Sequence, residues 1–259
     1  MTDLDSAHAA MDAAPEDDAA RLRFYERLAD SELFMLLEGE PVADQIEPSL
    51  FEIEGAQYAL VFDREERLAD FVGRAAPYAG LPGRALVQML AGQGIGLAFN
   101  VEVAPSAMLI PSEAVDWLVE VLQHAPDETE ARVEALSAPV GLPEAVITGL
   151  DRKLAIAAGL AKWAYLAAAT YEGGLKGHVL AFVDAKDGAE KALANAAGEA
   201  LTFSGIEAGV MDVMFCKASD PLAAHLAKVG LRFDLPEPAA AQPMPIAPGM
   251  DPDKPPRLR

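Results

Sequence analysis

The side chains most often used in catalysis and metal binding are few in this sequence, and their spacing matches none of the common motifs. The single cysteine, Cys216, has no CxxC partner and no histidine nearby, so we expect it to be a buried residue at a strand end. A zinc site needs three or four ligands at compatible spacings. The four histidines are too scattered to supply such a set: His8, His124, His178 and His225. We therefore predict no metal, no cofactor and no catalytic site.

A glycine-rich segment, Gly92-Gln93-Gly94-Ile95-Gly96, is the closest approach to a nucleotide-binding motif. A dinucleotide fingerprint follows a strand and opens a helix, so that helix amides face the phosphate. Here the glycines follow a predicted helix and lead into a predicted strand. They are therefore expected to form a tight turn.

The scattered Asp and Glu residues could also belong to the catalytic site of a hydrolase or transferase. This is a third possible function, beside the two that are given at the end of this section.

Three other residues are candidate ligand or partner contacts. Asn100 follows the predicted strand Ile95–Phe99, where its side chain could stabilise a turn or touch a ligand. Trp163 and Tyr165 could line a pocket, although aromatic residues at such spacings also occur in cores.

The charge balance narrows the class of partner. The 259 residues include 20 Lys and Arg but 41 Asp and Glu, for a formal net charge of −21. This negative charge disfavours binding to nucleic acid and to anionic membrane surfaces, because both bind clustered basic residues. Six acidic residues precede the first basic one, Arg21, whereas a signal peptide begins with basic residues. We expect a cytoplasmic protein, and its 52% hydrophobic content is ample for a packed core.

The order of predicted elements divides the chain into four parts. Residues 1–18 form an acidic lead-in that we expect to be mobile. Residues 19–126 alternate strands and helices, which predicts a mixed-sheet α/β domain; Glu54-Gly55 separates two strands of a hairpin, and Asp63 and Glu66 suggest a capping box. Residues 131–235 follow the order β-α-β-β-α-β and then one more helix, which predicts a ferredoxin-like α+β domain. Residues 236–259 are a proline-rich, extended tail.

Several segments of the first domain resemble the N-terminal domain of the SseB family. They are Pro48–Phe51, Gly55–Asp63 leading into Glu65–Leu68, Gly94–Asn100 and Leu109–Pro111. Where the family pattern often has Thr-Ser after the phenylalanine, this chain has Asp63-Arg64, and we add both residues to the candidate contacts. The second half is similar in outline to the family's C-terminal domain. The resemblance implies no catalytic residues, because the family has no well-established enzymatic activity.

Two functions follow from these observations. The first is a cytosolic, non-enzymatic interaction or scaffold protein that binds a protein partner or a second copy of itself through sheet edges or faces. The alternative is a small-ligand sensor of amino-acid metabolism with its pocket at the domain junction, suggested by the serine-sensitivity phenotype after which the family is named.

Overall fold

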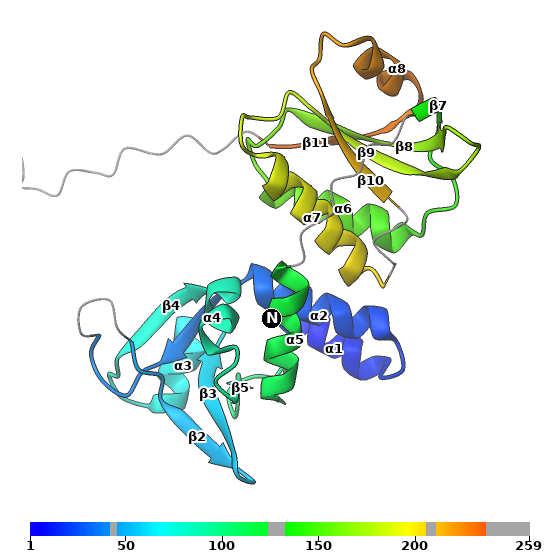
Figure 1. Cartoon of the computed structure of the whole chain (residues 1–259). Helices are drawn as coiled ribbons and strands as arrows, with labels where there is room; N and C mark the ends of the chain where they lie inside the picture. Colours follow the sequence, from blue (N-terminus) through cyan, green and yellow to red (C-terminus); the bar gives the residue numbers. More distant parts are fainter. Residues whose placement is uncertain (42–45, 124–132, 206–210, 237–259) are drawn as a thin grey trace, which may run out of the picture.

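The computed structural model describes residues 1–41, 46–123, 133–205 and 211–236 (Figure 1). It contains helices and mixed sheets, so the predicted α/β class is confirmed. The helices of these ranges are α1 (Asp3–Ala13), α2 (Asp18–Asp30), α3 (Glu65–Val72), α4 (Gly83–Leu90), α5 (Ser112–Gln123), α6 (Glu144–Ile156), α7 (Glu190–Phe203) and α8 (Pro221–Val229). His124, most of the predicted domain boundary and residues 237–259 of the tail lie outside the described ranges.

Eleven strands form two sheets, one in each half of the described chain. Those of the first sheet are β1 (Glu32–Leu36), β2 (Leu50–Ile53), β3 (Ala56–Phe62), β4 (Tyr78–Pro82), β5 (Ile95–Phe99) and β6 (Met108–Ile110). Those of the second are β7 (Val133–Ser137), β8 (Trp163–Tyr171), β9 (Lys176–Val183), β10 (Met211–Cys216) and β11 (Leu231–Asp234).

The first sheet has the order β4-β1-β3-β5-β6, with β2 paired to β3 across the predicted Glu54-Gly55 turn. Strands β3 and β5 pair in parallel, and the other strand pairs of this sheet are antiparallel. Every residue of β5 is buried, which explains why this strand reads as a continuous apolar run instead of an alternating one. The parallel pair matters for the site, because the carboxyl ends of β3 and β5 lie together.

Helices cover the two faces of the first sheet unequally. Helices α2, α4 and α5 bury Leu33, Val61 and Leu97 of one face in the main core. On the opposite face α3 packs its Leu68 on a smaller cluster around Leu60 and Phe62. A single short helix cannot cover a six-stranded sheet, so part of this second face stays exposed.

The second sheet does not have the predicted ferredoxin-like topology. A split βαβ unit would place another strand between β9 and β10, which α7 connects. Instead β9 and β10 pair directly in parallel, the order is β10-β9-β8-β11, and β7 pairs with β8. The sequence pattern does not predict β11, because this strand has four residues and only Gly230 separates it from α8. Helices α6 and α7 cover one face of this sheet, and α8 covers part of the other (Figure 1).

The prediction of a mobile lead-in is wrong for residues 3–13. Thr2 and Asp5 form a reciprocal capping box that starts α1, and Leu4 is buried in the main core. The acidic residues that suggested disorder are thus helix-starting residues. Helix α1 packs on α2, so the first domain begins near the first residue of the chain and not at residue 19. No helix in the described ranges has the length and apolarity to cross a membrane.

Candidate functional site

Two of the predicted contact residues meet at the carboxyl ends of the parallel strands β3 and β5. Asp63 follows β3 and Asn100 follows β5, so the strand pairing brings together two residues 37 positions apart. In open α/β sheets ligands commonly bind outside the carboxyl ends of parallel strands. This place is therefore the first candidate site.

Asn100 organises this end of the sheet. Its side chain is 0% exposed and its φ of 49° lies in the left-handed region, which asparagine adopts more readily than most residues. Its Oδ1 accepts a hydrogen bond from the Asp63 backbone N at 3.1 Å. Its Nδ2 donates to Ser106 Oγ at 3.0 Å. One buried amide thus fixes both the turn after β3 and the orientation of a serine hydroxyl.

The charged members of the site come from α1 and α3. Arg67 Nη2 and Nη1 donate to the Asp5 carboxylate at 2.6 and 3.0 Å, and Nη1 also donates to Asp63 Oδ1 at 2.7 Å. Ser106 Oγ donates to Asp5 Oδ1 at 2.6 Å. Thr2 Oγ1 donates to Asp63 Oδ2 at 2.6 Å. We call Asp63, Arg67, Asn100 and Ser106 the Arg67 cluster; Thr2 and Asp5 of α1 occupy it.

The Arg67 guanidinium and the Asp5 carboxylate shift each other's pKa values. Hydrogen bonding to Arg67 holds the pKa of Asp5 far below its usual range, although burial acts in the opposite direction; Ser106 and Thr2 lower it further. The same contact raises the pKa of Arg67. Arg67 and Asp5 are therefore both ionised at neutral pH, and neither is suited to transfer a proton there.

The remaining predicted contacts lie elsewhere. Arg64 is the N-cap residue of α3, is exposed and makes no side-chain capping bond, so the predicted capping box of Asp63 and Glu66 is wrong: the Asp63 carboxylate binds Thr2 and Arg67 instead. Arg67 itself was missed, although its i,i+4 spacing from Asp63 is a sequence signal. Asp5 and Ser106 gave no such signal, because 101 positions separate them.

Trp163 and Tyr165 belong to the second domain and do not approach the Arg67 cluster. The Arg232 guanidinium lies over the Trp163 ring, 4.8 Å from its centroid. Tyr165 is buried in the cluster beneath α8. Cys216 is buried at the end of β10, as predicted, and burial raises the pKa of its thiol, so it is a poor nucleophile.

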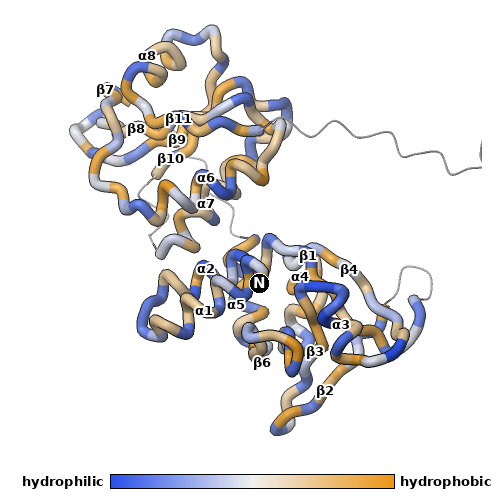
Figure 2. The backbone as a smooth tube through the Cα atoms, turned by 180° about the vertical axis from the view of Figure 1, so that it is seen from behind, coloured by the Kyte–Doolittle hydropathy of each residue, from blue (hydrophilic) through white to orange (hydrophobic). Residues whose placement is uncertain are grey.

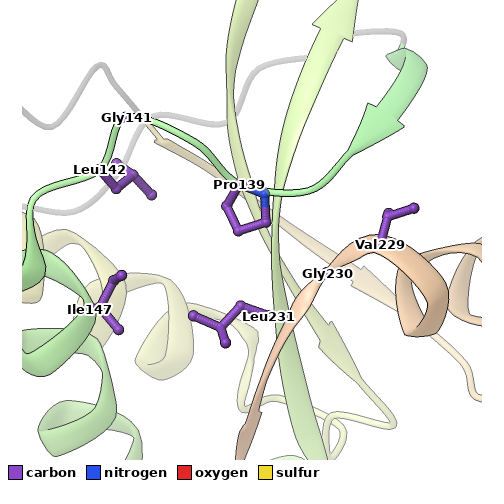
Figure 3. A pocket seen from close by; sticks show the side chains of 7 residues that line it. All are labelled: Pro139, Gly141, Leu142, Ile147, Val229, Gly230 and Leu231. Atoms are coloured by element: carbon purple, nitrogen blue, oxygen red, sulfur yellow. The ribbon is translucent and has the colours of Figure 1, made fainter.

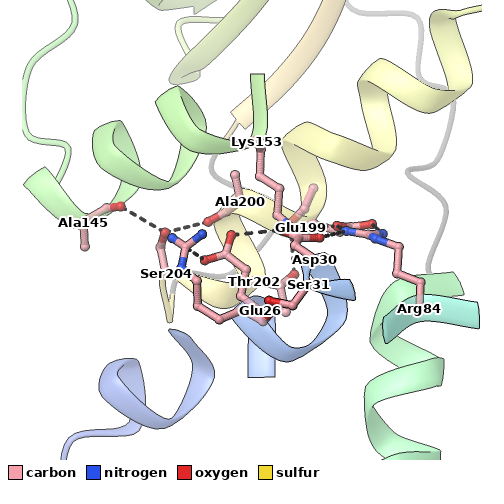
Figure 4. A network of polar contacts seen from close by, with 12 residues as sticks. Glu26, Asp30, Ser31, Arg84, Ala145, Lys153, Glu199, Ala200, Thr202 and Ser204 are labelled. Carbon is pink, nitrogen blue, oxygen red and sulfur yellow. Dashed lines mark hydrogen bonds and ion pairs between the residues drawn. The ribbon is translucent and has the colours of Figure 1, made fainter. Parts of the chain in front are cut away.

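A second group of charges joins the two domains (Figure 4). Arg84 of α4 makes a bidentate pair with Glu199 of α7 at 2.6 and 2.7 Å and contacts Asp30 of α2 at 2.5 Å. Lys153 of α6 lies 2.6 Å from Asp30 Oδ2 and 3.1 Å from Glu199 Oε2, with its side chain only 3% exposed. These four residues and Glu26 are called the junction cluster below.

Glu26 has no such close partner. Its Oε1 is buried without a hydrogen bond from any described residue, and Lys153 Nζ lies 3.7 Å away, beyond hydrogen-bonding distance. Burial raises the pKa of Glu26 more than the nearby Lys153 lowers it. Arg27 Nη2 also lies 3.8 Å from Glu26 Oε2, so two cations face Glu26 but neither lies within hydrogen-bonding distance. Glu26 is therefore the carboxylate of the junction cluster that the nearby cations satisfy least.

The cavities of the described residues are small or shallow. Beside the junction cluster, Arg84 and residues of α5 enclose about 140 Å³, well below the roughly 300–1,000 Å³ of typical ligand pockets. A groove of about 380 Å³ in the second domain is lined by the loop before α6, by Ile147 and by residues 229–231 (Figure 3). Its lining side chains are aliphatic, so any polar contact to a ligand there would come from the backbone.

The exposed part of the first sheet presents an apolar surface. Cross-strand pairing places Phe51, Tyr58 and Gly96 in one row across β2, β3 and β5. Tyr78 and Leu109 share this face, which points away from α2, α4 and α5. Phe51 is 52% exposed, and the β2–β3 hairpin extends away from the helices with hydrophobic residues along it (Figure 2). We call this surface the outer face.

One of three comparisons with known proteins found a match, and this match covers the first domain. No curated protein and no solved structure matches the chain. Residues 5–117 match the family model described as SseB protein N-terminal domain. The matched range begins at Asp5 and contains the complete Arg67 cluster and the outer face. The chain therefore carries an SseB N-terminal domain, and this match supports its membership of the SseB family.

Proposed function

We propose that the protein is a non-enzymatic interaction protein that docks another protein on the outer face. The observation that carries the proposal is the composition of this face. Of the strand residues that share it, Glu32 alone is charged, although acidic residues outnumber basic ones two to one in the chain. An apolar surface that includes an aromatic residue 52% exposed is typical of a protein–protein contact.

The charge of the molecule restricts the partner. Most of the surface of a chain with net charge −21 repels nucleic acid, anionic lipid and other acidic proteins. On the outer face this repulsion is weakest, so an uncharged surface of another protein, including a second copy of this chain, fits there. Because the chain has a single cysteine, which suits a reducing compartment, we propose that this interaction takes place in the cytoplasm.

The alternative of a sensor with its ligand at the domain junction has less support. Salt bridges between Arg84, Lys153 and their carboxylates fill the junction, and the adjacent cavity of about 140 Å³ is too small for most metabolites. A hydrolase or transferase would need converging carboxylates with raised pKa values in an open cleft. Glu26 has a raised pKa but is buried beneath the junction.

Light scattering after size-exclusion chromatography, over a range of concentrations, tests the self-association part of the proposal. The Phe51→Ser variant removes the most exposed aromatic side chain of the outer face. Leu175→Ser is the control, because Leu175 is also apolar, is even more exposed than Phe51 (71% against 52%), and lies in the β8–β9 hairpin turn instead of on the outer face. We expect the Phe51 variant to weaken association and the Leu175 variant to leave it unchanged. Equal effects of both variants would argue against the outer face.

A further inference from the structure

The Arg67 cluster contains the components of a binding site, and α1 supplies what fills it. Arg67 presents a planar fork of donors and Ser106 a hydroxyl, both directed at one carboxylate, that of Asp5. Asp63 lies beside them and accepts from the Thr2 hydroxyl. The arrangement is therefore complementary to a carboxylate that carries a hydrogen-bond donor nearby. Arg–carboxylate forks of this kind are strong and geometrically selective.

The cluster is rigidly built without α1. Asn100 is fully buried and holds both Ser106 and the backbone of Asp63, while Asp63 Oδ1 fixes Arg67 Nη1 at 2.7 Å. All four residues sit on β3, β5 or the segments that directly follow them. Removal of Thr2 and Asp5 would leave the donors and the acceptor in place at the carboxyl ends of two parallel strands, a usual position for ligands.

Helix α1 contributes one fully buried apolar side chain to the core. Of its eleven residues Leu4, Asp5 and His8 are buried, and only Leu4 of these is apolar, while Ala7 and Met11 pack partly buried against the same core. It carries three aspartates and no Lys or Arg, and it docks on a strongly acidic chain. Elements with few buried apolar contacts open at low free-energy cost. Helix α1 thus depends largely on the polar contacts of Thr2 and Asp5 with the Arg67 cluster, and a ligand that makes the same contacts replaces them.

We propose that Arg67, Ser106 and Asp63 form a binding site for small amino or hydroxy carboxylates, which Thr2 and Asp5 of α1 occupy until such a ligand displaces the helix. The ligand carboxylate takes the place of Asp5 between Arg67 and Ser106. The ligand's amino or hydroxyl group takes the place of the Thr2 hydroxyl and donates to Asp63. The site goes beyond the interaction proposed above and would provide the sensor alternative with a ligand site in the first domain.

Chemical rescue of the Asp5→Ala variant in the full chain tests this site. The substitution empties the carboxylate position, and we expect a lower Tm than that of the wild type. Glycine and acetate should raise this Tm saturably, since binding to the folded state stabilises it. Glycine should act at lower concentration than acetate, because its ammonium group reaches Asp63. Sodium chloride at equal ionic strength should not reproduce the effect.

The Asp5→Asn variant is the matched control. Its side chain still fills the position of the carboxylate, so glycine should not raise its Tm. Equal responses of the Ala and Asn variants, or no response of Asp5→Ala to either compound, would overturn the proposal. These two outcomes would not argue against docking on the outer face, because that proposal is tested with variants at Phe51 and Leu175, which leave Asp5 and Arg67 unchanged.

A second measurement applies if Asp5→Ala does not fold. The Leu4→Ala variant keeps Asp5 but removes the apolar anchor of α1. Glycine should then speed amide hydrogen exchange of residues 3–13 while exchange of β8 stays constant. Exchange of residues 3–13 that glycine leaves unchanged would contradict displacement of the helix.

Discussion

At the scale of single residues, the buried charged side chains give the most specific predictions, and Glu26 is the first of these residues. Its raised pKa means that the folded state binds the Glu26 proton more tightly than the unfolded state does. The stabilisation is therefore present at low pH, below the pKa of the unfolded state, and is lost as pH rises through the higher pKa of the folded state. At neutral pH the ionised Glu26 is a cost to folding.

We expect the Glu26→Gln variant to be more stable than the wild type at pH 8, by about 1 kcal/mol, the usual cost of one buried unsatisfied group. The gain should be smaller at pH 5 than at pH 8, because protonation of wild-type Glu26 removes the buried charge as the pH falls. Urea unfolding at both pH values measures the difference. The exposed Glu16→Gln is the control and should change little. A variant less stable than the wild type at pH 8 would show that ionised Glu26 stabilises the junction.

Lys153 gives a second prediction at this scale, because its buried ion pair with Asp30 has an exposed counterpart of the same length elsewhere in the chain. Lys153–Asp30 and Lys162–Asp184 both have N–O distances of 2.6 Å, but the Lys153 side chain is 3% exposed and the Lys162 side chain 60%. We expect Lys153→Met to cost about 3–5 kcal/mol, because it leaves buried carboxylates unpaired. Lys162→Met should cost less than about 1 kcal/mol. Similar losses in urea unfolding would mean that burial does not determine the contribution of these pairs.

At the scale of the elements, two glycines in regular structure should respond oppositely to alanine. A Cβ on Gly96 of β5 would lie 2.8 Å from the Tyr58 ring, whereas a Cβ on Gly198 of α7 would meet nothing within 4 Å. We expect Gly96→Ala to destabilise the protein by about 1–3 kcal/mol through overpacking. Gly198→Ala should stabilise it by up to about 1 kcal/mol through helix propensity. Thermal unfolding of both variants decides the point, and a stabilising Gly96→Ala would contradict the packing of Tyr58.

Local patterns in the sequence predicted most of these elements. The predicted hairpin across Glu54-Gly55 matches β2 and β3, and the predicted strand Ile95–Phe99 matches β5, because apolar runs bounded by turn residues are strong local signals. Helix α1 was missed because its composition resembles a disordered tail and its stability comes from Arg67, which lies 62 residues away. The strand order of the second sheet was also wrong, since the same order of elements is compatible with either a split or a directly paired βαβ unit.

Candidate site residues were predictable only in part, for the same reason. Asp63 and Asn100 were singled out from strand ends, and the parallel pairing of β3 with β5 brings them together. Their partners Asp5 and Ser106 come from segments that no local pattern connects. The junction cluster was missed altogether, because Arg84 and Glu199 are 115 positions apart and charged residues are common in this chain.

On the scale of the whole molecule, the two domains are joined by more than charge. Phe203 of α7 is buried in the core of the first domain, and the Lys153 ammonium lies 5.5 Å from the centre of its ring. An apolar anchor surrounded by salt bridges resembles the centre and rim of a protein interface. The junction is therefore already occupied by the chain itself, in keeping with our proposal that another protein docks on the outer face and not at the junction.

Affinity capture with the tagged full chain, in the presence of untagged chain and a lysate of the cells that produce it, tests that claim most directly. Mass spectrometry then compares what wild type, Phe51→Ser and Leu175→Ser retain. We expect wild type and Leu175→Ser to retain the same protein, either a partner or the untagged chain, and Phe51→Ser to lose it. If all three retain the same proteins, or none retains any, the outer face is not a docking surface.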